Sequence, residues 1–230
     1  MSTKPGAKTL ESMSQAVWYN RWTLKKFDRY LKGDILEVGC GIGNFTEELT
    51  RFGKVFAIDI DKEHISQTQT LLGKKAEVNL GDIESGSFFF NKNFDTVVCI
   101  NVLEHIKDDK KSLKSMYSLL KEGGYLILLA PAHQFLFGEI DKSIGHFRRY
   151  EKKELIKLLE QTGFKIEEER MLNILGALGW LISSKFFSEK IVDEKKIRIF
   201  NFIAPFILPF EDIFKPPFGT SILVVAKRAT

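Results

Sequence analysis

Three glycines at every second position follow a short apolar run, and one acid stands two residues before the first of them. The segment reads I-L-E-V-G-C-G-I-G from Ile35 to Gly43, with Glu37 as the acid. Glycines allow positive φ angles and let a ligand lie against bare backbone. A carboxylate beside such a loop repels a pyrophosphate and suits a ligand that carries positive charge. The spacing also differs from the G-x-G-x-x-G pattern of dinucleotide sites, so the segment predicts a site for a cationic ligand.

A second acid follows the next apolar run. Asp59 comes directly after the expected strand 54–58 and lies 20 residues beyond Gly39, a separation at which an acid can reach ribose hydroxyls. Asp61 competes for this role, but it precedes a segment with helical spacing and is better explained as a helix N-cap. We therefore assign ribose binding to Asp59.

Together with G-D-I at 81–83 and N-V-L-E-H-I at 101–106, these motifs resemble the class I S-adenosylmethionine-dependent methyltransferases. The resemblance implies that an acid after the third strand bonds the adenine amino group, although a turn aspartate is the alternative at Asp82. It also implies that the fourth strand ends beneath the methionine part of the cofactor. The cofactor-binding residues expected from it are Glu37, Gly39, Gly41, Gly43, Asp59, Ile60, Asp82, Ile83 and Asn101.

A second group of polar and titratable side chains lies in the 20 residues from Pro131 to Tyr150, directly after the strand expected at 125–130. His146 is the candidate general base, since histidine titrates near neutral pH, and His133 is the next candidate. Paired arginines suit a carboxylate or phosphate, although they also suit a salt-bridged helix flank. His105 either holds its loop or takes part in catalysis. The residues expected near the acceptor are Tyr19, His105, His133, Arg148, Arg149 and Tyr150.

The elements that must position these residues are strands alternating with helices. Apolar runs predict strands at 35–38, 54–58, 76–80, 94–100, 125–130, 164–170 and 221–226, and the spacing at 17–31 predicts a helix that covers the sheet. This pattern favours an α/β, Rossmann-like, doubly wound seven-stranded sheet. From the resemblance, the sheet is mostly parallel, and the last strand inserts antiparallel between the fifth and sixth.

The predicted organisation is a flexible tail at 1–16 and one methyltransferase domain at 17–230. The interval 171–220 holds two apolar stretches, at 171–184 and 197–210, and is expected to be a helical insertion. It is either a lid over the site or an apolar surface that docks on the inner leaflet of the membrane through 171–218. The G-H-F-R-R-Y segment resembles methyltransferases of bacterial surface-glycan and lipid-linked pathways.

Composition limits which other classes of protein the chain could belong to. The chain has 230 residues, 44% apolar residues and a net charge of +4, which is too mild to indicate nucleic acid. Its two cysteines indicate neither a disulfide framework nor a metal site, so no metal is expected. The chain lacks an apolar segment long enough to span a bilayer, and a cytoplasmic location is expected. No feature indicates an oligomeric state.

We therefore expect a methyltransferase that uses S-adenosylmethionine and methylates an O or N nucleophile of a small-molecule, glycan or lipid-linked acceptor. Two alternatives stay open. A nicotinamide-dependent oxidoreductase shares the glycine loop and Asp59, but it does not explain Glu37 together with Asp82. A non-catalytic, membrane-peripheral cofactor-binding protein would keep the pocket and lack a base.

Overall fold

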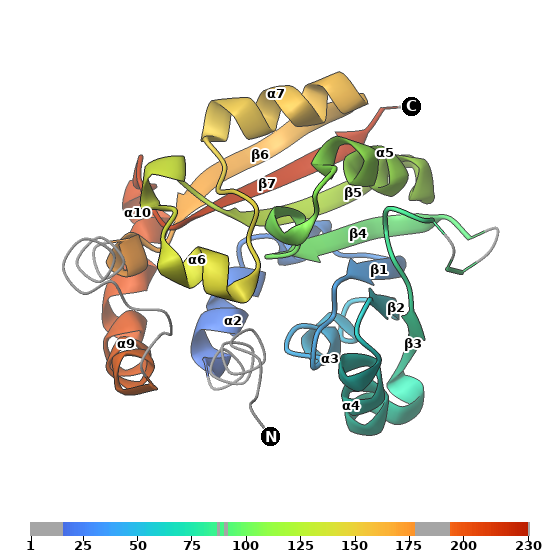
Figure 1. Ribbon diagram of the computed structural model, residues 1–230, viewed down its shortest axis with the longest axis horizontal. Coiled ribbons are helices and arrows are strands. Elements are labelled where there is room, and N and C mark those ends of the chain that lie inside the picture. The colour runs from blue at the N-terminus through green and yellow to red at the C-terminus, as the bar shows by residue number, and fades with distance from the viewer. Residues whose placement is uncertain (1–15, 87, 90–91, 178–193, 230) are drawn as a thin grey trace.

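A twisted sheet of seven strands organises the protein, and helices cover both of its faces (Figure 1). The structure is a computed structural model that describes residues 16–86, 88–89, 92–177 and 194–229. The strands are β1 (Asp34–Val38), β2 (Lys54–Asp59), β3 (Ala76–Leu80), β4 (Phe94–Ile100), β5 (Leu120–Pro131), β6 (Phe164–Leu172) and β7 (Ser221–Arg228).

The strand order is β3-β2-β1-β4-β5-β7-β6. β1 lies between β2 and β4, and all pairs from β3 to β5 are parallel. β7 inserts antiparallel between β5 and β6. This topology confirms the predicted mostly parallel, doubly wound sheet. It also places the strand order reversal between β1 and β4, which is where open α/β sheets bind ligands.

The central strands of the sheet are buried on both faces, because their successive side chains enter opposite apolar cores. Leu36 packs in one core and Ile35 in the other, and along β5 Leu128 and Leu129 divide in the same way. This is why the central strands are continuous apolar runs in the sequence, whereas the edge strands β3 and β6 carry polar residues at exposed positions.

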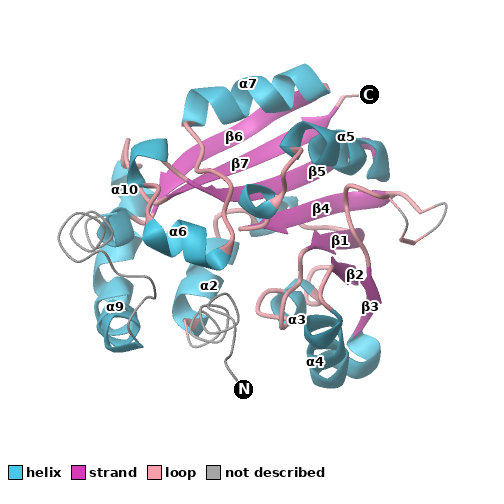
Figure 2. Ribbon diagram, viewed as in Figure 1, coloured by secondary structure: helices cyan, strands magenta, loops and turns pink. Residues whose placement is uncertain are grey.

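Helices form a layer on each side of the sheet (Figure 2). Apolar residues of α5 and α7 pack into one core, and residues of α2, α3 and α9 pack into the other. The α-helices are α2 (Val17–Leu24), α3 (Thr46–Leu49), α4 (Lys62–Leu72), α5 (Asp109–Leu119), α6 (Glu139–Ile144), α7 (Lys152–Thr162), α9 (Glu194–Ile207) and α10 (Glu211–Phe214). The short 3₁₀ helices are η1 (Asp28–Tyr30), η2 (Gly73–Lys75), η3 (Leu103–His105), η4 (Gln134–Leu136) and η5 (Leu208–Phe210).

Three boundaries differ from the sequence prediction. The helix expected at 17–31 ends at Leu24, because the backbone bonds shorten to the i→i−3 type at Lys26 and Phe27 and turn the chain. The helical spacing of Phe45, Leu49 and Phe52 predicts a helix after the glycine loop, and that helix has only four residues. β5 begins at Leu120, before the two glycines, since residues 121–124 form a bulge opposite β4.

The segment between β6 and β7 contains α9, η5 and α10, which run along one end of the sheet (Figure 1). Residues 178–193 of the expected insertion, and residues 1–15 of the expected tail, lie outside the described residues. Ala16, the last residue of that tail, is buried in the core. Within the described part of the chain, no helix is both long enough and apolar enough to cross a membrane.

Candidate functional site

The glycine loop connects β1 to α3 in a conformation that only glycine adopts easily. Gly39, Gly41 and Gly43 have φ angles of +74°, +53° and +90°. The Gly39 amide donates to the carbonyl of Ile58 at 2.8 Å, which ties the loop to the end of β2. A Cβ on Gly39 would overlap the side chain of Val102, so the loop also lies against the segment that follows β4.

Asp59 holds this loop from the end of β2. Its Oδ2 accepts from the Gly41 amide at 2.8 Å, and its Oδ1 accepts from the Asp61 amide at 2.9 Å. Oδ1 also lies 3.4 Å from His64 Nδ1. Because a carboxylate oxygen can accept two bonds, Oδ2 can still bind a hydroxyl. Asp61 accepts from the Glu63 amide at 2.8 Å and caps α4, which confirms its structural assignment. Ribose binding by Asp59 stays a prediction.

Glu37 is buried beside the loop without full pairing. Its Oε2 has no hydrogen-bond partner among the described residues. Burial, together with the nearby charge of Asp59, raises the pKa of Glu37 to about 8. An unpaired buried carboxylate costs free energy, so this site fits a cationic ligand group such as an ammonium. The arrangement agrees with the sequence expectation of a positively charged ligand.

A surface cavity of about 260 Å³ is lined in part by residues of the same loop. Asn20 and Arg21 of α2 form one wall, and Gly43, Asn44 and the end of α4 form the other. Neither Glu37 nor Asp59 is among the lining residues. The cavity therefore does not include these two acids, and ligand binding at the strand ends stays a prediction.

The remaining expected cofactor residues also lie at carboxyl ends of strands. Asp82 follows β3 and accepts from the Glu84 amide at 2.8 Å, so it shapes the turn, while Ile83 is buried in the core. Ile60 follows β2 and is 76% exposed. Asn101 follows β4 with φ of +52°, and its amide donates to Leu129 at 2.8 Å. Their cofactor contacts stay predictions.

A buried polar cluster forms around Asp141, which lies in the first turn of α6 and accepts from the Gly138 amide at 2.9 Å. Asp141 Oδ1 lies 2.8 Å from His146 Nδ1 and 2.9 Å from Arg149 Nε. Burial raises the pKa of Asp141, but the bond from His146 and the charge of Arg149 outweigh it and hold this pKa below its usual value. The cluster therefore fixes both the position and the ring orientation of His146.

The neighbouring residues of the G-H-F-R-R-Y segment have protein partners as well. Arg148 Nη1 lies 2.7 Å from Asp109 Oδ2, and its Nη2 donates to the Lys107 carbonyl at 2.7 Å. The Tyr150 hydroxyl lies 3.1 Å from Asp109 Oδ2. These bonds anchor the segment after α6 to the start of α5. They match the salt-bridged alternative for the arginines, and the acceptor role of Arg148, Arg149 and Tyr150 stays a prediction.

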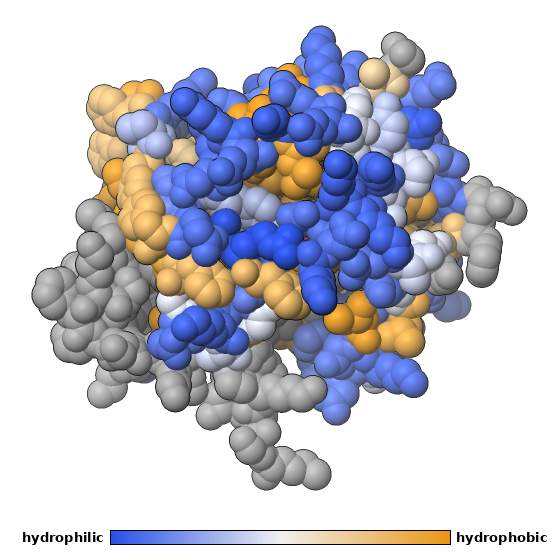
Figure 3. Space-filling view, turned by 45° about the horizontal axis from the view of Figure 1, so that its top comes forward, coloured by the Kyte–Doolittle hydropathy of each residue, from blue (hydrophilic) through white to orange (hydrophobic). Residues whose placement is uncertain are grey.

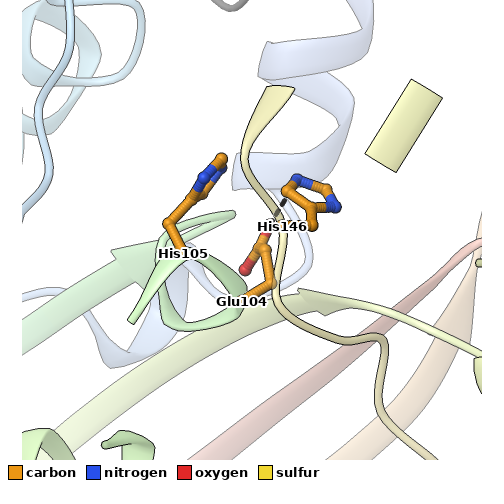
Figure 4. Close-up of side chains that lie close together, drawn as sticks. All are labelled: Glu104, His105 and His146. Atoms are coloured by element: carbon orange, nitrogen blue, oxygen red, sulfur yellow. Dashed lines mark ion pairs between the residues drawn. The ribbon is translucent and has the colours of Figure 1, made fainter. Parts of the chain in front are cut away.

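Glu104 and His105 of η3 face His146 (Figure 4). The His146 Nε2 lies 3.7 Å from Glu104 Oε1, and the rings of His105 and His146 meet edge to face at 4.5 Å. Glu104 is fully buried, and burial raises its pKa to about 8. Sequence reasoning singled out the two histidines but neither Glu104 nor Asp141. Their signals were weak, since one lay inside an apolar motif and the other at an ordinary helix N-terminal position.

His133 and Tyr19 lie elsewhere around the same end of the sheet. His133 has φ of +64°, stacks on Phe218 at 4.4 Å, and has a buried Nε2 without a partner among the described residues. Tyr19 packs in the core against Trp22 and Phe200. The expected acceptor contacts of both residues stay predictions.

The fold, the left-handed glycine loop and the acids at the strand ends together define a methyltransferase domain. The chain belongs to the methyltransferase domain family, which its residues 19–169 match. The family match covers the glycine loop and every polar residue described above.

Individual relatives are distant. The chain is 29% identical over 151 residues to the ubiquinone biosynthesis O-methyltransferase of Xanthomonas euvesicatoria, an overlap that covers 58% of this chain and 63% of that protein. An uncharacterized protein of Methanocaldococcus jannaschii is 29% identical over 191 residues, 80% of each chain. The structure of an S-adenosylmethionine-dependent methyltransferase from Archaeoglobus fulgidus is similar with a TM-score of 0.62, 23% identity and coverage of 92% and 94%. This last likeness confirms the fold.

Proposed function

We propose that the protein binds S-adenosylmethionine and transfers its methyl group to an O or N nucleophile of a small-molecule, glycan or lipid-linked acceptor. The observation that carries the proposal is the buried, incompletely paired carboxylate of Glu37 beside a loop of left-handed glycines. A dinucleotide pyrophosphate would meet a carboxylate there, whereas the ammonium of S-adenosylmethionine would satisfy it.

Residues at the ends of different strands bind different parts of the cofactor. Glu37 holds the ammonium, Asp59 accepts from the ribose hydroxyls, and Asp82 accepts from the adenine amino group. The exposed side chain of Ile60 gives the adenosine an apolar contact. When bound, the cofactor supplies a methyl group that its sulfonium already activates.

The protein's share of the reaction is alignment, exclusion of water and removal of one proton. Orientation alone can lower a barrier by about 7–11 kcal/mol. His146 is the proposed proton acceptor, because Asp141 holds its Nδ1 and leaves Nε2 as the reactive nitrogen. His105, His133 and Tyr19 are the proposed acceptor contacts around it.

Exposed apolar side chains favour an acceptor that carries a lipid or lies at a membrane. Phe202 and Phe206 of α9 are 75% and 68% exposed, and Phe210, Ile213 and Phe214 continue this surface. Figure 3 shows hydrophobic residues gathered at the edge of the molecule where α9 and α10 lie in Figure 1. This α9–α10 face supports peripheral contact with the inner leaflet.

Thermal shift tests the proposal with purified protein and either S-adenosylmethionine or NAD. At 100 times its dissociation constant a ligand stabilises the native state by about 2.7 kcal/mol, so S-adenosylmethionine should raise the Tm clearly. NAD at the same concentration should have no effect. A larger shift with NAD would overturn the proposal in favour of an oxidoreductase. The Glu37→Gln variant should lose most of the S-adenosylmethionine shift, because the amide cannot neutralise the ammonium.

A further inference from the structure

Three groups that commonly bind metals converge beside η3. Glu104 and His105 come from η3, and His146 comes from the segment after α6, 41 residues further along the chain. No two of their ligand atoms lie more than 4.8 Å apart (Figure 4). This long separation in sequence explains why motif spacing indicated no metal.

His146 is oriented as a metal-binding histidine usually is. Its Nδ1 is held by the Asp141 carboxylate at 2.8 Å, so the lone pair of Nε2 is directed to the other side of the ring, where Glu104 lies. Metal-bound histidines generally have a carboxylate or carbonyl on the second nitrogen, which fixes the tautomer. Arg149 balances the charge of Asp141 from 2.9 Å, so Asp141 does not need a further cation.

The buried carboxyl group of Glu104 lacks hydrogen-bond partners. Its side chain is fully buried, and neither of its oxygens accepts a hydrogen bond from another described residue. His146 Nε2 lies 3.7 Å from Glu104 Oε1, which is beyond hydrogen-bonding distance. Leaving a buried carboxylate unpaired is costly, and a cation between Glu104 and His146 would remove this cost.

The distances suit a small transition-metal ion. Zinc bonds to nitrogen and carboxylate oxygen are about 2.0–2.2 Å, so two ligand atoms of a tetrahedral site lie about 3.4 Å apart. The 3.7 Å between His146 Nε2 and Glu104 Oε1 is close to this separation. His105 is exposed and completes the site from the solvent side, which gives an ion a path of entry.

We infer that Glu104, His105 and His146 form a binding site for one divalent transition-metal ion of the zinc type. Two imidazoles and one carboxylate match the ligand set of open zinc sites, in which a fourth position remains for water or substrate. Two nitrogen ligands disfavour Mg²⁺ and Ca²⁺, which prefer oxygen.

The use of such an ion rests on the proposed function. A metal at this position would bind the acceptor hydroxyl through its open coordination position and lower the pKa of that hydroxyl, so that it loses its proton at neutral pH. A metal-bound Nε2 has no lone pair left for a proton. In the metal-bound protein, His146 would therefore be a ligand, and the proton of the bound hydroxyl would pass to water and not to His146.

Calorimetric titration of the purified full chain with ZnCl₂, without S-adenosylmethionine, tests the site. We expect one ion per chain with a micromolar or lower dissociation constant. The isosteric Glu104→Gln variant, His146→Ala and His105→Ala should each weaken binding at least tenfold. His64→Ala is the matched control, since it removes an imidazole near Asp59 and should leave zinc affinity unchanged. Far-UV circular dichroism of every variant checks folding.

Cobalt gives a second readout on the unaltered protein. Co²⁺ should bind at the same stoichiometry with the visible absorption of a four- or five-coordinate site, and Zn²⁺ should displace it. No stoichiometric zinc binding, or unchanged affinity in any folded variant of the three ligands, would overturn the assignment. Because no cofactor is present, these results do not depend on whether the protein transfers methyl groups.

Discussion

At the scale of single residues, the site is built from acids with unequal degrees of pairing. Asp59 and Asp61 both accept backbone bonds, whereas Glu37 and Glu104 are buried with unpaired oxygens. The paired acids shape the loop and the helix terminus. The unpaired acids cost stability and are therefore the ones that need a ligand.

The first prediction separates the two aspartates after β2. Asp59→Ala should weaken S-adenosylmethionine binding by roughly 1.5–3 kcal/mol for each charge-assisted bond lost. Asp61→Ala removes the N-cap of α4 and should cost about 1 kcal/mol of folding stability with little change in affinity. Calorimetric titration measures the affinities, and urea unfolding measures the stabilities. Loss of binding in Asp61→Ala with full binding in Asp59→Ala would show that the ribose assignment is wrong.

The second prediction concerns the pH dependence of stability. The pKa of Glu37 is about 8 in the folded protein, above its ordinary value of 4.5. Between these values the native state binds more protons than the unfolded state, so stability falls as pH rises, by about 1.4 kcal/mol per unit for this group. Glu37→Gln should remove that part of the slope and be more stable than the unchanged protein at pH 8.

Urea unfolding between pH 5 and pH 8 measures the difference. Glu77→Gln, at an exposed position of β3, is the matched control and should keep the original slope. Parallel slopes for Glu37→Gln and the unchanged protein would mean that Glu37 is not desolvated.

At the scale of elements, the sequence predicted the strands well and the short helices poorly. All seven strands were identified, and the central ones were the clearest because buried strands are continuous apolar runs. The end of α2 at Leu24 and the bulge before Tyr125 were missed, since a switch to i→i−3 bonds and a bulge leave no periodic signal. The contact of η3 with the segment after α6 joins residues about 40 apart. Only tertiary structure brings such residues together.

The third prediction tests the element that carries His146. Asp141 is fully buried and joins α6 to Arg149 and His146. Breaking a buried ion pair on one side costs about 3–5 kcal/mol, because the remaining charge stays desolvated. Asp141→Asn should therefore lower the free energy of unfolding by that amount in urea titrations. Glu139→Gln, which breaks the more exposed pair with Lys142 on the same helix, should cost less than about 1 kcal/mol.

A loss of under 1 kcal/mol for Asp141→Asn would contradict this account. It would mean that Arg149 finds another partner and that α6 is held mainly by its apolar residues.

At the scale of the whole molecule, the chain places its polar site and its apolar surface close to one end of the sheet. The polar groups follow the carboxyl ends of the central strands, and the α9–α10 face lies near β6 and β7 (Figure 1). The resemblance of sequence motifs was sufficient to predict the fold and the cofactor class. It could not predict the acceptor, because most of the residues expected to contact it, such as His133, Arg148 and Arg149, come from segments outside the shared motifs.

The fourth prediction tests the α9–α10 face. The protein should float with anionic liposomes at low salt and release as salt rises, since the exposed basic residues Arg198 and Lys215 contribute electrostatic attraction. Changing Phe202, Phe206 and Phe210 to Ser should abolish flotation while cofactor binding is retained. Leu80→Ser alters an exposed apolar residue on the opposite edge of the sheet and should float normally. No flotation of the unchanged protein would leave the face with the role of a lid.

The place of β7 has a consequence for how the protein is made. β6 is joined to the rest of the sheet only through β7, which is synthesised about 50 residues later. Until β7 emerges from the ribosome, β6 has no partner and the edge of β5 stays open, with backbone groups free to pair with other chains. The nascent protein therefore passes through a stage at which five strands can assemble while the sixth waits. Its yield in the cell should depend on how well that edge is shielded during this interval.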